Sequence, residues 1–208
     1  MIKDIYKYEE ELASQGYKYI CGCDEAGRGP MAGPLVAASV ILPIGYKLDS
    51  LDDSKKLTKK VREKLFDIIY KDAIEVQVEV ISVSDVDNLN VYKASKIAMT
   101  NCVKRFKNKA DYCLTDCMPL DIDIPVLSLV KGDSKSASIA AASVIAKVTR
   151  DKIMDELDKI YPMYGFKKHK GYVTKFHLEM LDKYGVSDVH RKSFAPVRKR
   201  LNEQMKLF

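Results

Sequence analysis

Four acidic residues of this sequence stand where strands and loops are expected to meet. Asp24 and Glu25 end an apolar segment and lead into a glycine-rich turn at residues 27–30, and Asp116 ends a second apolar segment. Asp133 lies between a third such segment and a long helical pattern. Carboxylates gathered without histidines favour hard cations such as Mg²⁺ or Mn²⁺. Two such ions about 4 Å apart can activate a water and stabilise the leaving oxygen of a phosphodiester.

These acids can serve one site only if the backbone brings them together. Neighbouring residues of a regular strand face opposite ways, so the chain must turn at Glu25 if Asp24 and Glu25 are to share a site. The glycines that follow permit such a turn. Asp116 shares a strand face with Leu114 by parity. If the two strands run parallel, Asp116 and Asp24 lie at the same edge of the sheet.

Each acid also has a simpler explanation. Asp24 and Glu25 could form a turn that caps a helix or a loop. Asp133, beside Ser134, could be a helix N-cap, because aspartate and serine are favoured there. Asp116 could be an ordinary strand-ending residue. The residues alone leave both interpretations open.

The apolar periodicity predicts the elements that position these residues. Strands are expected at residues 17–24, 35–42, 74–83, 110–116 and 125–130. Helices are expected at residues 2–14, 58–70, 90–106, 136–160 and 173–184, followed by a basic tail. Thr58 is the expected N-cap of the second helix. Strands interleaved with helices imply an α/β fold with a mixed sheet flanked by helices.

Length and composition favour a cytoplasmic globular protein. The chain has 208 residues, 47% hydrophobic and 31% charged, and we expect a single domain over residues 1–208. We find no signal peptide, and the longest apolar stretch, Pro34 to Ile44, is too short to cross a bilayer. The five cysteines match no zinc-ribbon spacing, and we expect them to be buried small apolar side chains in a reducing compartment.

Basic residues outnumber acidic ones by 35 to 29, a surplus of only six, so their distribution decides what they imply. They gather at residues 55–62, 104–109, 167–170 and 191–200. These clusters could converge on one face that attracts phosphates, as in nucleic-acid-binding proteins. Each could equally be the solvated face of a helix.

The motifs around the acids resemble those of a known family. The segment at residues 23–36, which reads CDEAGRGPMAGPLV, resembles the opening motif of bacterial ribonuclease HII, a type 2 ribonuclease H. Further segments match this family in order, at residues 53–57, 131–134, 140–151, 164–166, 169–172 and 190–194. Together they span roughly residues 18 to 198.

The resemblance implies a ribonuclease H-like fold with a mixed five-stranded sheet. We expect an N-terminal helix at residues 1–16 and a helical C-terminal extension at 160–208 that contributes to substrate binding. The implied activity is a metal-dependent endoribonuclease that cuts the RNA strand of RNA–DNA hybrids and also cuts at single ribonucleotides in duplex DNA. Cleavage leaves a 3′-hydroxyl and a 5′-phosphate and serves ribonucleotide excision and RNA primer removal.

By motif position, the resemblance makes Asp24, Glu25, Asp116 and Asp133 both the catalytic residues and the ligands of two Mg²⁺ or Mn²⁺ ions. Asp24 would bridge the ions, and a metal-bound water would attack the phosphate without a covalent nucleophile. One position departs from the family pattern. Cys117 follows Asp116, where the family usually has glycine.

The resemblance also implies seven substrate-binding residues: Gly27, Arg28, Gly29, Lys55, Lys168, Lys170 and Tyr172. The glycine-rich element contacts the 2′-hydroxyl next to the scissile phosphate, the group that distinguishes RNA from DNA. The tyrosine lies against the sugar that follows the ribonucleotide, which favours an RNA-to-DNA junction. The lysines contact phosphates and position the duplex without reading its sequence.

The expected partners are RNA–DNA hybrids and ribonucleotide-containing duplex DNA, with no membrane, and we expect a monomer. The tail at residues 204–208 could bind the replication sliding clamp, as family members often do, or could be a disordered terminus. Two other functions remain open: a non-catalytic hybrid-binding module, and a nuclease of this fold with other specificity, such as ribonuclease HIII. The short N-terminus, Arg28 and Tyr172 argue against ribonuclease HIII.

Overall fold

The computed structural model describes residues 4–48, 51 and 57–205 of the chain. The chain divides into two compact units, each built from three segments. The first unit consists of Met1–Ala26, Val36–Glu79 and Ser95–Val148, and the second of Gly27–Leu35, Val80–Ala94 and Thr149–Phe208. A single domain over residues 1–208 stays a prediction.

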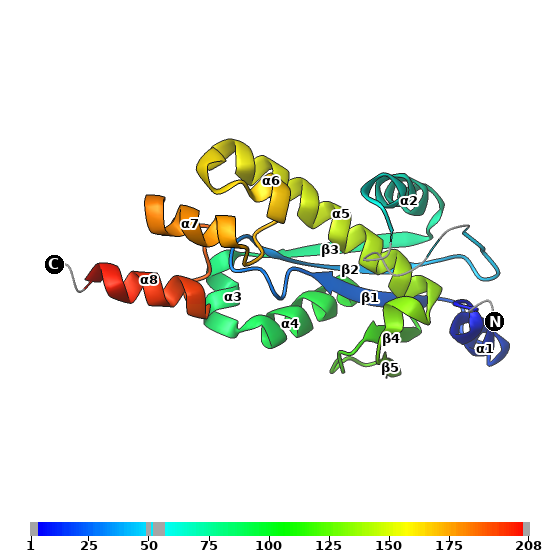
Figure 1. Cartoon of the computed structure of the whole chain (residues 1–208). Helices are drawn as coiled ribbons and strands as arrows, with labels where there is room; N and C mark the ends of the chain where they lie inside the picture. Colours follow the sequence, from blue (N-terminus) through cyan, green and yellow to red (C-terminus); the bar gives the residue numbers. More distant parts are fainter. Residues whose placement is uncertain (1–3, 49–50, 52–56, 206–208) are drawn as a thin grey trace. The chain divides into compact units, whose positions relative to one another are not determined.

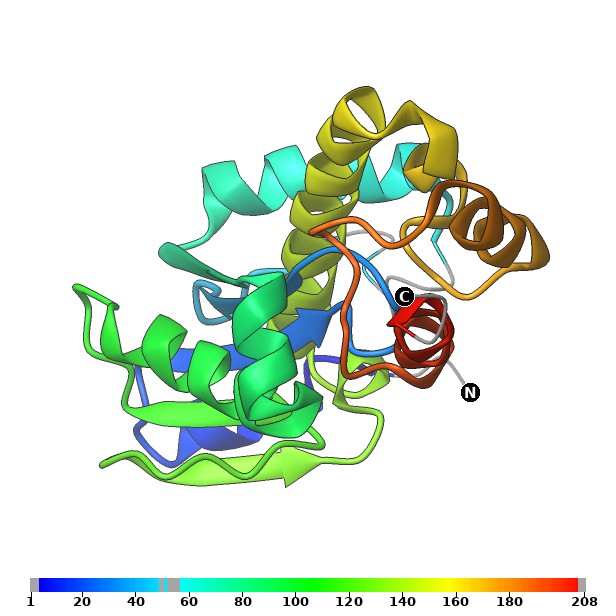
Figure 2. The same ribbon diagram turned by 90° about the vertical axis from the view of Figure 1, so that its left-hand side faces the viewer.

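Most of a five-stranded sheet belongs to the first unit (Figure 1), with strand order β3-β2-β1-β4-β5. The strands are β1 (Ile20–Ala26), β2 (Leu35–Ile41), β3 (Glu75–Ile81), β4 (Tyr112–Asp116) and β5 (Val126–Leu129). β1 pairs antiparallel with β2 and parallel with β4, which pairs parallel with β5. Figure 2 shows the green strands beside the blue β1. The predicted mixed sheet of five strands is confirmed.

The two central strands are covered on both faces. All seven residues of β2 and the first five of β1 are buried, as expected of near-continuous apolar runs. Helix α5 (Ala137–Ile160) packs closely on β1. A Cβ atom on Gly22 would lie 2.1 Å from the carbonyl carbon of Ser138, so only glycine lets this helix approach the strand.

The remaining elements of the first unit connect the strands. They are α1 (Lys7–Ser14), α2 (Lys59–Asp72), most of α4 (Val91–Lys104) and the 3₁₀ turn η1 (Gly132–Ser134). Thr58 Oγ1 accepts a hydrogen bond from the Val61 amide at 3.3 Å, which confirms the predicted N-cap of α2.

The second unit is mostly helical. Its elements are α3 (Val83–Leu89), the carboxyl end of α5, η2 (Pro162–Tyr164), α6 (Phe166–His169), α7 (Lys175–Tyr184) and α8 (Ala195–Met205). Its core includes Met31, Met154, Phe166, Leu181 and Val197. In the part of the chain that the structure describes, no helix is both long and apolar enough to cross a membrane.

Two predicted boundaries are wrong. The strand expected at residues 74–83 ends at Ile81, because Ser82 Oγ accepts from the Asp85 amide at 3.1 Å and caps the unpredicted helix α3. The helix expected from residue 2 begins at Lys7. It follows a turn in which the Asp4 carboxylate accepts a hydrogen bond from the Tyr6 amide at 2.9 Å. Helix α8 occupies the expected basic tail, in agreement with the helical C-terminal extension.

Candidate metal centre

Three carboxylates converge where β1 and β4 end. Asp24 near the end of β1, Asp116 at the end of β4 and Asp133 in η1 each offer an oxygen within 4.8 Å of the other two. β1 and β4 run parallel with Cys23 opposite Thr115, so the residues that follow emerge at the same edge of the sheet. The parallel pairing that the acids required is therefore present.

Asp24 is held in a costly environment for a carboxylate. Its side chain is only 4% exposed, and this burial raises the pKa of the carboxyl well above its ordinary value. The charges of Glu25 and Asp116 raise the pKa further, while a hydrogen bond from Ser143 lowers it. The Glu25 amide also donates to Oδ1 at 2.7 Å. A cation bound among these acids would relieve both the burial and the repulsion.

Asp116 ties β4 to the loop that carries Asp133. Its Oδ1 accepts a hydrogen bond from the Gly132 amide at 2.7 Å. Gly132 leaves no room for a side chain, because a Cβ there would lie 2.7 Å from Ile139 and 3.3 Å from Leu129. This packing holds Asp133, which is 3% exposed, beside the other two acids.

The N-cap interpretation of Asp133 is wrong. At the start of α5, the Ile139 amide donates to Ser136 Oγ at 3.2 Å, so Ser136 is the capping residue. Glu9 Oε1 accepts from the Ser138 amide at 2.9 Å and satisfies a second donor of the same turn. The Asp133 carboxylate lies in the acid cluster instead.

Glu25 is not among the three acids whose oxygens meet in the described residues. The chain does not turn at Glu25, because β1 continues through Ala26 and places Glu25 opposite Ala37 of β2. The backbone enters the left-handed region two residues later, at Gly27, with φ +105°. Glu25 is half-buried, and its charge helps to raise the pKa of Asp24.

In the second unit, the glycine-rich segment lies against a buried arginine and an exposed tyrosine. A Cβ on Gly27 would lie 2.4 Å from Arg150 Nε, which excludes any other residue. A Cβ on Gly29 would lie 3.5 Å from the ring of Tyr172, a residue that is 47% exposed. Arg28, between the two glycines in the sequence, is exposed. This unit thus joins the two elements that the resemblance assigned to the sugars of the substrate.

Comparison with known proteins identifies the family. The family model for ribonuclease HII matches residues 21–197. The chain belongs to the ribonuclease HII family. It is 50% identical over 203 residues to ribonuclease HII of Acholeplasma laidlawii, which covers 98% of this chain and 100% of that relative. It is 53% identical over 189 residues to ribonuclease HII of Acetivibrio thermocellus, covering 90% of this chain and 74% of the relative.

Solved structures agree with this assignment. Ribonuclease H2 from Pyrococcus horikoshii OT3 superposes with a TM-score of 0.77 at 25% identity, covering 90% of this chain and 99% of that one. Ribonuclease HII in a PCNA complex from Archaeoglobus fulgidus gives a TM-score of 0.67 at 27% identity, covering 83% and 93%. The ribonuclease H-like fold is confirmed, and membership of the ribonuclease HII family makes this chain an endoribonuclease.

Two buried arginines hold the loop at residues 27–34, which carries the glycine-rich motif of ribonuclease HII. Neither arginine is identified as functional from the sequence. Arg150 donates to three backbone carbonyls at 2.9–3.0 Å, those of Ala32, Pro34 and Lys170. Arg191 donates to two further carbonyls of the same loop at 2.9 and 3.3 Å. Burial lowers the pKa of the guanidinium groups, to about 10 for Arg150 and about 9 for Arg191. Both residues lie in matched motifs, but only tertiary packing reveals their burial.

A chain of hydrogen bonds within the second unit begins at the Tyr172 carbonyl. His177 Nδ1 lies 3.0 Å from this carbonyl, and His177 Nε2 lies 3.0 Å from His190 Nε2. The Ser187 amide donates to His190 Nδ1 at 3.1 Å, so His190 must donate from Nε2 and His177 from Nδ1. Burial lowers the pKa to about 4 for His177 and about 3 for His190, which keeps both neutral.

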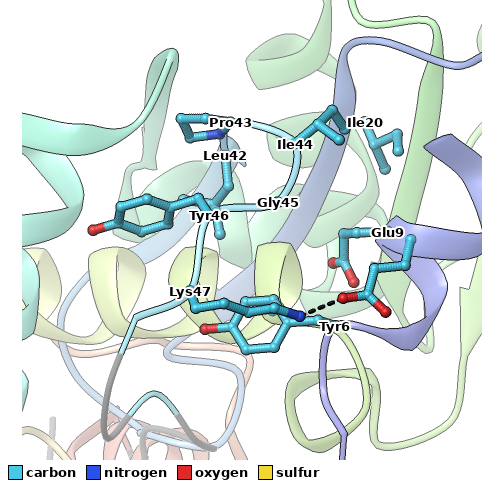
Figure 3. A pocket seen from close by; sticks show the side chains of 11 residues that line it. Tyr6, Glu9, Ile20, Leu42, Pro43, Ile44, Gly45, Tyr46 and Lys47 are labelled. Carbon is cyan, nitrogen blue, oxygen red and sulfur yellow. Dashed lines mark hydrogen bonds and ion pairs between the residues drawn. The ribbon is translucent and has the colours of Figure 1, made fainter.

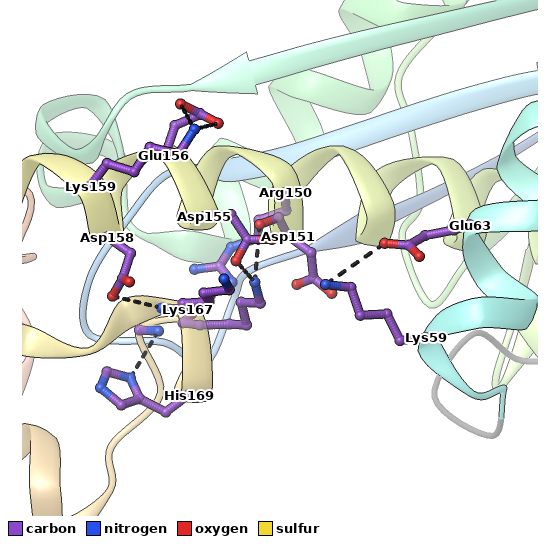
Figure 4. Close-up of polar contacts among 12 residues, drawn as sticks. Lys59, Glu63, Arg150, Asp151, Asp155, Glu156, Asp158, Lys159, Lys167 and His169 are labelled. Carbon is purple, nitrogen blue, oxygen red and sulfur yellow. Dashed lines mark hydrogen bonds and ion pairs between the residues drawn. The ribbon is translucent and has the colours of Figure 1, made fainter. Parts of the chain in front are cut away.

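Two of the three lysines predicted to contact phosphates differ in how exposed and how paired they are. Lys168 is exposed. The Lys170 ammonium forms an ion pair with Asp155 and donates to the Asp151 carbonyl at 3.2 Å, in the region shown in Figure 4. Lys170 therefore has less of its charge available to a phosphate than Lys168 has. Lys55 lies outside the described residues.

A small pocket in the first unit is separate from the acids (Figure 3). Its lining includes Tyr6, Ile20, Tyr46 and Lys47, and Lys47 forms an ion pair with Glu10. None of the four predicted acids lines this pocket. A ribonuclease HII acts on a duplex, so a hollow of this size does not mark its substrate site.

Proposed function

We propose that Asp24, Glu25, Asp116 and Asp133 bind divalent metal ions, Mg²⁺ or Mn²⁺, for hydrolysis of RNA. The observation that carries this proposal is the meeting of three carboxylate oxygens within 4.8 Å of one another. An oxygen-only donor set suits hard cations, so the residues fit the group that the family implies. The charge of Glu25, which acts on Asp24, supports its inclusion as the fourth acid.

The surrounding residues prepare the carboxylates for this role. Bound divalent ions supply an activated water and stabilise the charge that develops on the phosphodiester. The Ser143 side chain and the Glu25 amide bond the Asp24 carboxylate and favour its charged form. The Gly132 amide orients Asp116 in the same way. Carboxylates oriented in advance need little reorganisation during the reaction.

We propose that residues 27–29 recognise the 2′-hydroxyl next to the scissile phosphate and that Tyr172 lies against the following sugar. Glycines let backbone amides approach a sugar closely, and Gly29 lies beside the exposed Tyr172 ring. The substrates are RNA–DNA hybrids and duplex DNA with single ribonucleotides. The products carry a 3′-hydroxyl and a 5′-phosphate.

A duplex DNA with one embedded ribonucleotide tests the acids directly. The native protein with Mg²⁺ or Mn²⁺ should cut on the 5′ side of the ribonucleotide. Asp24→Asn should bind the same duplex but cut it at least about 10²-fold more slowly, because one oriented charge at a reacting centre is worth several kcal/mol. Tight binding without cutting by the native protein would contradict the enzymatic role and favour a hybrid-binding module.

Tyr172→Ala tests the recognition of the sugar. We expect this variant to lose roughly tenfold in cleavage at an RNA–DNA junction, since one aromatic contact to a nucleotide is worth about 1–3 kcal/mol. Tyr184→Ala is the matched control, because Tyr184 is exposed to a similar extent, 49% against 47%. Equal losses in the two variants would remove Tyr172 from the substrate site.

The tail at residues 204–208 is proposed to bind a sliding clamp. The solved complex from Archaeoglobus fulgidus contains PCNA together with ribonuclease HII. The side chains from residue 203 onward lie outside the described part of this chain. Deletion of residues 204–208 should abolish clamp binding and leave cleavage unchanged, and binding retained by the shortened chain would refute the proposal. We further propose that the protein acts as a monomer in the cytoplasm, where its duplex substrates are formed.

A further inference from the structure

β1 and β4 carry three buried thiols that the ribonuclease reaction does not use. Cys21, Cys23 and Cys113 are each 0% exposed, and their Sγ atoms all lie within 4.8 Å of one another. Cys21 is opposite Cys113 in the parallel register, and the sulfurs of Cys23 and Cys113 are 3.6 Å apart. We call these three residues the thiol cluster.

The thiol cluster lies on the other face of β1 from helix α5. Side chains alternate along a strand, so Cys21 and Cys23 point away from the face of Gly22, which packs against Ser138. Asp24 shares the parity of Gly22 and belongs to the acid cluster. The two clusters therefore differ both in position and in ligand chemistry, sulfur in one and oxygen in the other.

The spacing of the sulfurs suits a single central atom. Three sulfurs at bond lengths of about 2.3 Å lie about 4.0 Å apart when the centre is in their plane, and closer when it stands above them as a pyramid. The observed 3.6 Å between Cys23 and Cys113 favours the pyramid. The third sulfur, that of Cys21, lies within 4.8 Å of the other two, so each of its distances exceeds 3.6 Å by at most 1.2 Å (4.8 − 3.6).

Burial selects the charge of the bound atom. A monovalent ion bound by three thiolates would leave two negative charges in the core, and a divalent ion would leave one. Either result is unfavourable, because an uncompensated charge in the core is costly. A trivalent centre gives a neutral product. Trivalent arsenic combines this charge with a preference for thiolates and a pyramidal arrangement of three ligands.

We propose that Cys21, Cys23 and Cys113 form a binding site for trivalent arsenic, supplied as arsenous acid. Each thiol sulfur forms a bond to arsenic as one arsenic–oxygen bond breaks, and the thiol proton leaves with the hydroxide as water. One As(OH)₃ and three thiols thus give one As(S-Cys)₃ and three waters, with no change in oxidation state. The bound atom cross-links β1 to β4 and reaches the cluster through local opening or during folding.

Mass spectrometry of the reduced full-length protein after incubation with arsenite tests this site. Incubation is carried out both with the native protein over long times and during refolding from denaturant. We expect one arsenic per chain, retained against an excess of a small monothiol, and a higher melting temperature. Cys23→Ala and Cys113→Ala should each lose this retention, with Cys23→Val as a second variant that suits a strand.

Two other cysteines are the matched controls. Cys102 is also buried but does not belong to the thiol cluster, and Cys117 is exposed. Cys102→Ala and Cys117→Ala should both retain one arsenic. The proposal is overturned if neither incubation gives a retained arsenic, or if the retained arsenic survives in the Cys23 and Cys113 variants. Cleavage assays are not needed, so this outcome is independent of the proposed reaction.

Discussion

Cys117 occupies a left-handed backbone position directly after Asp116, with φ +50°. A side chain in this region costs roughly 1–2 kcal/mol relative to an ordinary conformation. The conformation is held by the Cys117 amide, which donates to the Leu129 carbonyl at 3.0 Å. Glycine adopts it without strain, which explains the glycine usual at this position in the family motif. Replacement of the family's usual glycine by Cys117 therefore affects mainly the backbone conformation, because the Cys117 side chain is exposed.

Substitution of Cys117 tests this explanation. Cys117→Gly should keep cleavage and change the free energy of unfolding by less than about 1 kcal/mol, because relief of strain offsets the added freedom of the unfolded chain. Cys117→Val should be about 1–2 kcal/mol less stable than Cys117→Gly, because a β-branched residue tolerates the left-handed region poorly. Urea unfolding measures both, and equal stability of the two variants would contradict the argument.

Single residues differ in how far the sequence reveals them. Asp24 and Asp116 could be predicted because each follows an apolar strand pattern, and the resemblance added Asp133. Arg150 and Arg191 could not be recognised as loop anchors, since arginine is usually exposed and only the folded chain surrounds these two with backbone carbonyls.

At the scale of elements, strand pairing and caps decide where prediction succeeds. A shared site for Asp24 and Asp116 requires β1 and β4 to run parallel, and they do. No turn forms at Glu25, because pairing with β2 extends β1 to Ala26, a long-range effect with no local signal. Helix α3 was missed because Val83, its first residue, extends the valine- and isoleucine-rich run of β3, and only the cap at Ser82 separates the two elements.

Helix α7 depends on a neutral His177, which makes the stability of the protein sensitive to acid. The pKa of His177 is lowered to about 4 in the folded protein, so the unfolded chain binds the proton more strongly. Stability should be complete above the ordinary pKa of about 6.5, decline as the pH falls towards about 4, and decline no further from this group below that. The slope is at most about 1.4 kcal/mol per pH unit.

Urea unfolding at several pH values between about 7 and 4 measures this decline. His177→Gln should be less stable near neutrality, because its contact with His190 changes, and should lose less stability on acidification. Lys175→Gln, at an exposed position of the same helix, should follow the native protein. An unchanged acid slope in His177→Gln would show that another group is responsible.

At the scale of the whole molecule, the charge surplus of six understates how unevenly the basic residues are placed. Some lysines are neutralised within the fold, as Lys170 is by Asp155 and Lys96 by Asp121. Lys168 is exposed. Attraction of nucleic acid therefore depends on a subset of the lysines, which explains why composition alone could not distinguish a phosphate-binding face from solvated helices.

The salt dependence of duplex binding should separate these lysines. The logarithm of the binding constant falls linearly with the logarithm of salt concentration, by about 0.9 for each phosphate neutralised. Measured on the Asp24→Asn protein with a ribonucleotide-containing duplex, Lys168→Ala should reduce the slope by about one. Lys170→Ala should change the slope less, because its ammonium already pairs with Asp155. Lys7→Ala, which removes an exposed lysine paired with Glu11 on α1, is the control and should leave the slope unchanged. A reduction by Lys170→Ala as large as that by Lys168→Ala would mean that substrate phosphate displaces Asp155 from Lys170.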